Sequence, residues 1–71
     1  MTDADRFRGH LEALGIGQND AARVTGADFR TVRRWASGDL RLPASVETLL
    51  CVMREFEITV DQVIDAWEKF A

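Results

Sequence analysis

The stretch from Gln18 to Gly38 constrains the fold more than any other, because it has the pattern of two short helices joined by a glycine turn. The first segment begins at Gln18 or Asn19, where a side chain at the helix start can cap it, and carries small residues that let a second helix approach closely. Gly26 then supplies the turn, since a residue without Cβ adopts a positive φ at little cost. We therefore predict a helix–turn–helix unit over residues 18–37.

The second helix of this unit has a sharply divided surface. Asp28 is a suitable N-cap and Gly38 a suitable C-cap. Val32, Trp35 and Ala36 recur at i, i+3 and i+4, so they form the inner face. The residues left for the outer faces are Phe29, Arg30, Arg33, Arg34 and Ser37.

Amphipathic segments lie on both sides of the unit. Before it, Thr2 and Asp5 can cap a helix that ends at Gly15. After it, Pro43 begins another helix at a position that needs no N–H. The apolar stripe of that helix comprises Val46, Leu49, Leu50, Met53 and Phe56.

A capping-box pattern at Thr59 and Gln62 predicts a fifth helix over about residues 60–70. Its apolar stripe comprises Val60, Val63, Ile64, Trp67 and Phe70. This stripe either closes the core or forms part of a dimer interface, and both alternatives stay open. The fold class that follows is all-α, a single compact five-helix domain over residues 1–71.

The distribution of charge matters more than its total. The net charge is −3, which by itself argues against a nucleic-acid partner. From Arg23 to Arg41, however, five arginines face only Asp28 and Asp39, for a net +3, whereas residues 1–22 and 42–71 carry −2 and −4. A basic middle between acidic flanks indicates one positive face, although an unevenly charged, solvated surface is the alternative.

Several classes of protein are excluded by what the chain lacks. No run approaches about 18 apolar residues, so we expect no membrane span, and residues 1–8 lack the order of a signal peptide. The one cysteine, Cys51, fits a reducing cytoplasm, and we expect it to be a buried or half-buried inert thiol. His10 has no partner at ligand spacing, which favours a partly exposed structural histidine. We therefore expect no enzyme, metal site or cofactor.

Residues 15–38 resemble the Cro/C1-type helix–turn–helix of the XRE family of transcriptional regulators. The family pattern is L-S-Q-x-x-x-A-x-x-x-G-x-S-x-x-x-I-x-x-W-x-x-G, and the resemblance covers about residues 7–63. The positions that match it in register are Gln18, Ala22, Gly26, Val32, Trp35 and Gly38. The resemblance implies a lambda-repressor-like fold and a DNA-binding regulator.

Three departures from the family pattern bear on the expected site. Gly17 stands where the family usually has Ser or Thr, which weakens the cap of the first helix of the unit. Asp28 replaces a neutral residue at the start of the reading helix, where its charge would repel a nearby phosphate. Phe29 stands where the family often has a polar residue, and it would either touch a thymine methyl group or simply pack.

The resemblance implies that the second helix of the unit lies in the major groove of double-stranded DNA. The base-reading positions would then be held by Phe29, Arg30, Arg33 and Arg34. Arg30 and Arg34 are four residues apart, hence on one face, and each can bond to guanine. The candidate phosphate contacts are Gln18, Asn19, Thr31, Ser37 and Arg41.

One copy of such a unit reads only a few base pairs, so we expect a homodimer on an inverted repeat in operator DNA. The residues that we assign to its interface are Val60, Ile64, Trp67 and Phe70. The resemblance implies a repressor or autoregulator in the cytoplasm of a bacterial or phage-infected cell. The alternative, favoured by the acidic flanks and the terminal aromatic residues, is a protein-interaction module such as an antitoxin or a polymerase-associated factor.

Overall fold

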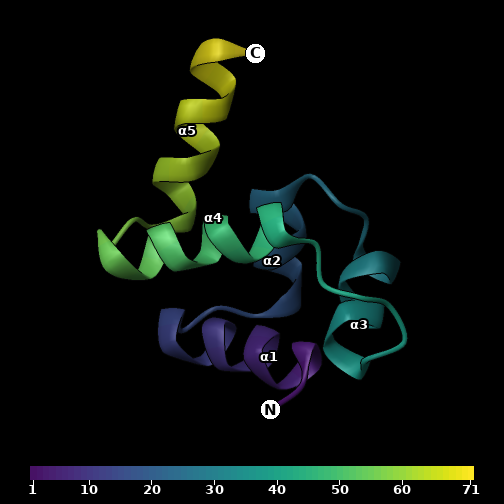
Figure 1. Ribbon diagram of the computed structural model, residues 1–71. Coiled ribbons are helices and arrows are strands. Elements are labelled where there is room, and N and C mark those ends of the chain that lie inside the picture. Colours follow the sequence, from purple (N-terminus) through teal and green to yellow (C-terminus); the bar gives the residue numbers. More distant parts are fainter.

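The computed structural model describes residues 1–71 and contains five helices and no strands (Figure 1). Their bounds are Asp3–Leu14 (α1), Gln18–Thr25 (α2), Phe29–Ser37 (α3), Ala44–Glu55 (α4) and Val60–Phe70 (α5). The prediction of an all-α, five-helix fold is therefore confirmed. No helix combines the length and the apolar character that a membrane crossing requires.

The first four helices form the body of the molecule. α1 packs against both α3 and α4, and α2 packs against α3. α5 contacts α2 and then extends away from the other helices towards the C-terminus (Figure 1). The helix–turn–helix unit α2–α3 is consequently supported by α1, while α5 is attached on the side of α2.

Local interactions place the starts of α1 and α5 and the turn between α2 and α3 where the sequence predicts them. Thr2 and Asp5 exchange two hydrogen bonds of 3.1 Å at the start of α1. Thr59 and Gln62 make the matching pair, of 2.8 and 3.1 Å, at the start of α5. Between α2 and α3, Gly26 has a φ of 75°, a left-handed conformation that side chains with a Cβ rarely adopt. Both capping boxes and the glycine turn are therefore confirmed.

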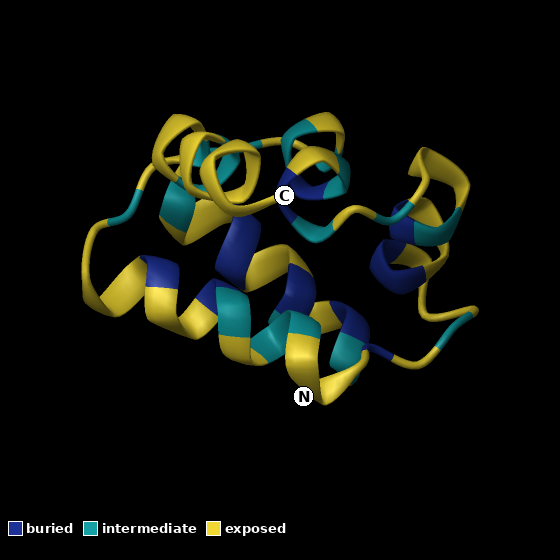
Figure 2. Cartoon of the chain, turned by 90° about the horizontal axis from the view of Figure 1, so that it is seen from above, coloured by how far each residue is buried: buried dark blue, intermediate teal, exposed yellow.

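The core lies between α1, α2, α3 and α4, and the buried positions of the helices face one another (Figure 2). Its largest fully buried side chains are Phe7, Val32, Leu50 and Met53. Trp35 and Ala36 are buried with Val32, so the predicted inner face of α3 is confirmed. None of the residues of α5 is fully buried.

The apolar stripe of α5 divides into two parts. Val60 and Val63 are partly buried and pack against the core. Trp67 and Phe70 lie further along the helix, and their exposed fractions are 69% and 82%. The first part of the stripe therefore closes the core, and the second part is left uncovered.

Two polar residues lie differently from the prediction. His10 is buried rather than partly exposed, with an exposed fraction of 8%. It tolerates burial because Glu47 and Arg54 of α4 each contact one of its ring nitrogens. Cys51 is exposed rather than buried, because it lies beside the α4 stripe and does not join the core.

Helix ends account for the remaining differences. Phe56, predicted on the α4 stripe, is 69% exposed because α4 ends one residue before it. α2 begins directly after Gly17, which has no side chain, so neither Gln18 nor Asn19 caps it as predicted. Pro43 is the N-cap of α4 rather than its first helical residue.

Candidate nucleic-acid interface

α3 presents its arginines on the side opposite the core. At about 100° per residue, Arg30 and Arg34 point only about 40° apart, with Arg33 beside them. All three arginines are exposed, whereas Val32 and Trp35 on the other side of the helix are buried. Burial of the apolar face therefore turns the basic face towards solvent.

This face forms one wall of an open hollow of about 620 Å³, which we call the basic hollow. Its lining comes from α1, α2, α3 and one residue of the loop after α3. The residues that line it are Arg8, Gln18, Arg30, Arg33, Arg34, Ala36, Ser37 and Asp39. Four arginines and a single carboxylate thus share one polar concavity.

The arginines of α3 are free of carboxylate partners. The ion pairs of the structure involve Arg6, Arg8, His10 and Arg23 as the basic partners. Arg30, Arg33 and Arg34 take part in none of them. Their guanidinium groups are consequently available to an external anion, in contrast to those of α1 and α2.

Arg8, on α1, lines the hollow but is already engaged. Its guanidinium donates one hydrogen bond of 2.6 Å to Asp5 and another to the carbonyl oxygen of Ala36. That carbonyl belongs to the last turn of α3, where a positive charge also complements the helix dipole. Arg8 therefore fastens α1 to the end of α3. We did not predict this residue, since its sequence spacing indicates only the pair with Asp5.

The N-terminus of α3 is held by Asp28. Its Oδ1 accepts a hydrogen bond of 2.7 Å from the backbone N–H of Thr31, as predicted for an N-cap. This backbone hydrogen bond is the main reason why the pKa of Asp28 lies below its usual value. The carboxylate that departs from the family pattern is thus committed to the helix start.

The N-terminus of α2 also faces the hollow, through Gln18. No side chain caps this helix, in contrast to α1, α3 and α5. The first amide groups of a helix carry partial positive charge and bind anions readily when they are free. These free amides therefore add partial positive charge beside the arginines, and the neutral side chain of Gln18 adds a hydrogen-bond donor.

The other predicted site residues divide into two groups. Ser37 lines the hollow, and its hydroxyl group donates a hydrogen bond of 3.2 Å to the carbonyl oxygen of Arg34. The residues outside its lining are Asn19, Phe29, Thr31 and Arg41. Phe29 is 43% exposed, and helical geometry places it between the buried face and Arg33. Arg41 is exposed in the loop after α3 and forms no ion pair.

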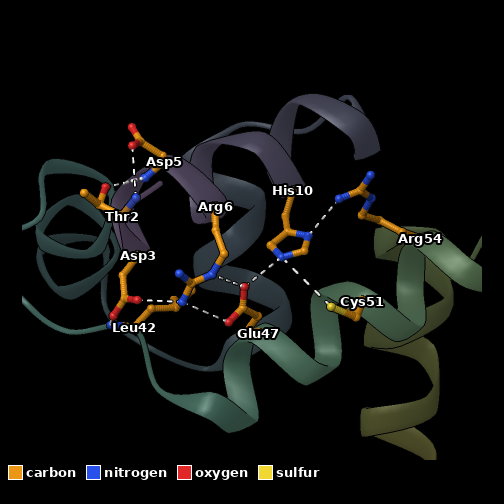
Figure 3. Close-up of polar contacts among 9 residues, drawn as sticks. All are labelled: Thr2, Asp3, Asp5, Arg6, His10, Leu42, Glu47, Cys51 and Arg54. Atoms are coloured by element: carbon orange, nitrogen blue, oxygen red, sulfur yellow. Dashed lines mark hydrogen bonds and ion pairs between the residues drawn. The ribbon is translucent and has the colours of Figure 1, made fainter.

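A second polar cluster joins α1 to α4 (Figure 3). Nε2 of His10 lies 3.1 Å from Oε2 of Glu47, and its Nδ1 lies 3.1 Å from Nη1 of Arg54. Because arginine is only a donor, Nδ1 must accept, and the ring proton is then on Nε2 and is donated to Glu47. The Sγ atom of Cys51 lies 4.0 Å from Nε2 of His10.

The same cluster reaches the loop that leaves α3. Arg6 donates hydrogen bonds of 2.9 Å to Glu47 and 2.6 Å to Asp3, and Asp3 accepts one of 3.3 Å from the backbone N–H of Leu42. The hydrogen bond from Arg6 lowers the pKa of Glu47 and also that of Asp3. None of these residues lines the basic hollow. We therefore infer that this cluster holds together α1, α4 and the loop between α3 and α4.

Comparisons of the chain with protein-family models, with curated proteins and with solved structures gave no match. The class to which it belongs is therefore defined by its architecture and its surface. It is a small all-α protein with a helix–turn–helix unit whose second helix carries an exposed, unpaired basic face.

Proposed function

We propose that this protein is a non-enzymatic, sequence-specific regulator of transcription that binds double-stranded DNA, of the Cro/C1 type that its sequence resembles. We place it in the cytoplasm of a bacterial or phage-infected cell. One observation carries the proposal. Three exposed arginines of α3 have no carboxylate partner and share a hollow with the uncapped N-terminus of α2.

In the proposed complex, α3 lies in the major groove, which is about 12 Å wide and admits one helix. Arg30 and Arg34 each form two hydrogen bonds with N7 and O6 of a guanine, which contribute about 1–3 kcal/mol of discrimination apiece. Arg33 points to the edge of the same face and contacts a second base or a flanking phosphate. Phe29, exposed at the start of α3, is positioned for a thymine methyl group.

Contacts to the DNA backbone would set the register of α3 in the groove. Gln18 and the free amides of α2 hold one phosphate. Because its amide is occupied by Asp28, Thr31 offers only its hydroxyl group. Asn19, Ser37 and Arg41 complete the set of candidate phosphate contacts.

We propose that the active species is a homodimer on an inverted repeat, formed through the uncovered end of α5. Trp67 and Phe70 are large apolar side chains that the chain itself leaves exposed. α5 packs against α2 and contributes no residue to the basic hollow, so we infer that a second copy docked on the outer part of α5 leaves the arginines of α3 uncovered. A two-fold dimer then presents two reading helices to two half-sites, and its position over a promoter represses transcription.

The DNA proposal is tested by selecting 25-base-pair duplexes from a random pool and measuring their affinity by fluorescence anisotropy. DNA from upstream of the protein's own gene serves as a second probe. We expect affinity to fall steeply with rising salt, because bound phosphates release counterions. Arg30→Ala and Arg34→Ala should each weaken the selected duplex by about 1–3 kcal/mol and relax the preference at one base pair.

The matched control is Lys69→Gln, which removes one positive charge from α5, away from the basic hollow. It should leave the preference for the selected duplex unchanged. If Arg30→Ala and Arg34→Ala bind the selected duplex as tightly as the unmodified protein, the assignment of α3 as the reading helix is wrong. Failure of the pool to yield any duplex would reject the DNA function.

The exposed end of α5 also supports the second candidate, a protein-interaction module. Sedimentation of the double variant Trp67→Ala/Phe70→Ala and of the unmodified protein distinguishes a homodimer interface from a surface for another protein. We expect the unmodified protein to be dimeric at micromolar concentration and the variant to be monomeric with its helix content intact. An unmodified protein that stays monomeric, alone and on DNA, would refute the dimer and leave this surface to a different protein partner.

A further inference from the structure

Asp39 is the one carboxylate that lines the basic hollow. It follows the left-handed Gly38 directly after α3 and is exposed. Although four arginines line the same hollow, Asp39 forms an ion pair with none of them. Its side chain makes no hydrogen bond either, and only its backbone N–H is engaged, at 3.4 Å from the hydroxyl group of Ser37.

No hydrogen bond or ion pair within the chain accounts for a carboxylate at this position. The C-terminal end of a helix carries partial negative charge, so an anionic side chain there is unfavourable and a lysine or arginine is favoured. The acidic residues Asp3 and Asp28, in contrast, are bonded to backbone amides at 3.3 and 2.7 Å. Asp39, in contrast, places its charge near a helix C-terminus and is bonded to no partner within the chain.

We propose that Asp39 is a specificity-determining residue, which keeps a DNA phosphate away from Arg30 and Arg34 and so reserves these two arginines for base edges. The inference rests on the proposed DNA function and deepens it. Non-specific binding maximises phosphate contacts, and a hollow with several arginines would otherwise hold the DNA backbone. A fixed negative charge in the same hollow repels that mode of binding. In the specific mode α3 enters the major groove, and the phosphates lie at the rims of that groove. Gln18 then contacts one of these phosphates.

The test is Asp39→Asn, which keeps the size of the side chain and removes the charge. Its affinity is measured by anisotropy for the duplex selected with the unmodified protein and for a 25-base-pair duplex of shuffled sequence. The control is Asp61→Asn, the same change on an exposed residue of α5 outside the hollow. Circular dichroism checks that the helix content of both variants is unchanged.

We expect Asp39→Asn to strengthen binding to the shuffled duplex by about fivefold, the factor for two unit charges about 4 Å apart in water. Its salt dependence on that duplex should steepen by about one phosphate contact. Affinity for the selected duplex should change by much less, so the ratio of the affinity for the selected duplex to that for the shuffled duplex falls.

An equal gain on both duplexes, or no gain on either, overturns the role of Asp39 while leaving the DNA function intact. An equal effect of Asp61→Asn also overturns it, because the change in net charge would then be sufficient to explain the gain in affinity. If the unmodified protein selects no duplex from the pool, the DNA function is rejected and this inference with it.

Discussion

Phe7 and Trp35 meet edge to face, with their ring centroids 5.8 Å apart and their planes at 78°. Phe7 is fully buried and Trp35 is 4% exposed. The pair joins the middle of α1 to the inner face of α3, directly behind the arginines that line the basic hollow. An aromatic pair with fixed geometry therefore backs the surface that we assign to DNA.

Truncation of a side chain of this pair should strongly lower the stability of the protein. We expect Phe7→Ala to destabilise the protein by roughly 3–5 kcal/mol, because it removes the apolar contacts of a fully buried ring and leaves a cavity. That loss is comparable to the whole stability of a domain of this size. Urea denaturation followed by circular dichroism measures it. Phe7→Leu should lose less and stay folded, and a denaturation midpoint for Phe7→Ala equal to that of the unmodified protein would contradict the assignment of the core.

Gly9 offers a substitution with the opposite sign. It lies exposed inside α1, and a Cβ built on it meets no atom within 4 Å. Alanine loses less conformational entropy than glycine when it enters a helix. Gly9→Ala should therefore stabilise the protein by about 0.5–1 kcal/mol, visible as a higher melting temperature. A lower melting temperature would mean that α1 is not helical at this position.

Gly26 should respond in the other direction to the same change. A Cβ on it also meets no atom within 4 Å, so only its φ of 75° opposes a side chain. We expect Gly26→Ala to destabilise the protein by about 1–2 kcal/mol and Gly26→Asn by less, since asparagine tolerates this conformation better. Gly9→Ala, measured in parallel, controls for the added methyl group. Equal melting temperatures for the Ala and Asn variants would argue against a left-handed turn.

Acid should weaken the cluster around Glu47. The hydrogen bonds from Arg6 and then from His10 hold the pKa of Glu47 below its usual value. The unfolded chain therefore binds the proton more tightly, so the stabilisation is present at neutral pH and is lost as the pH falls through about 4 and below. Melting temperatures from pH 7 to pH 3 should drop less steeply for Glu47→Gln than for the unmodified protein.

The matched control for this titration is Asp65→Asn, on an exposed carboxylate of α5 that forms no ion pair. Its melting temperature should follow pH as the unmodified protein does. At pH 7, Glu47→Gln should be the less stable of the two variants, because it leaves Arg6 and His10 without their shared acceptor. Parallel curves for Glu47→Gln and the unmodified protein would show that the cluster does not contribute to folding.

Most of the fold could be predicted from short-range patterns. Helix ends depend on residues close in sequence, so the bonds of Thr2 with Asp5 and the turn at Gly26 were accessible without a structure. Phe56 shows the limit of periodicity. It continues the α4 stripe by spacing, but the helix ends before it and its side chain faces solvent.

The candidate site was only partly predictable, because side-chain partners depend on how distant helices pack. His10 and Glu47 are 37 residues apart, and only the packing of α1 on α4 brings them together. The same holds for Arg8, whose contact with Ala36 spans 28 residues. Asp39 was counted in the charge balance, but its place in the hollow with the arginines depends on the direction in which the chain leaves α3.

The contrast between the two tryptophans gives the protein two separate spectroscopic reporters. Trp35 is buried in the core, Trp67 is 69% exposed on α5, and there are no tyrosines. Emission from Trp35 should shift to longer wavelength only when the core opens, whereas Trp67 responds to whatever covers α5. Replacement of either tryptophan by phenylalanine isolates the other, so unfolding and association can be followed independently in the same small chain.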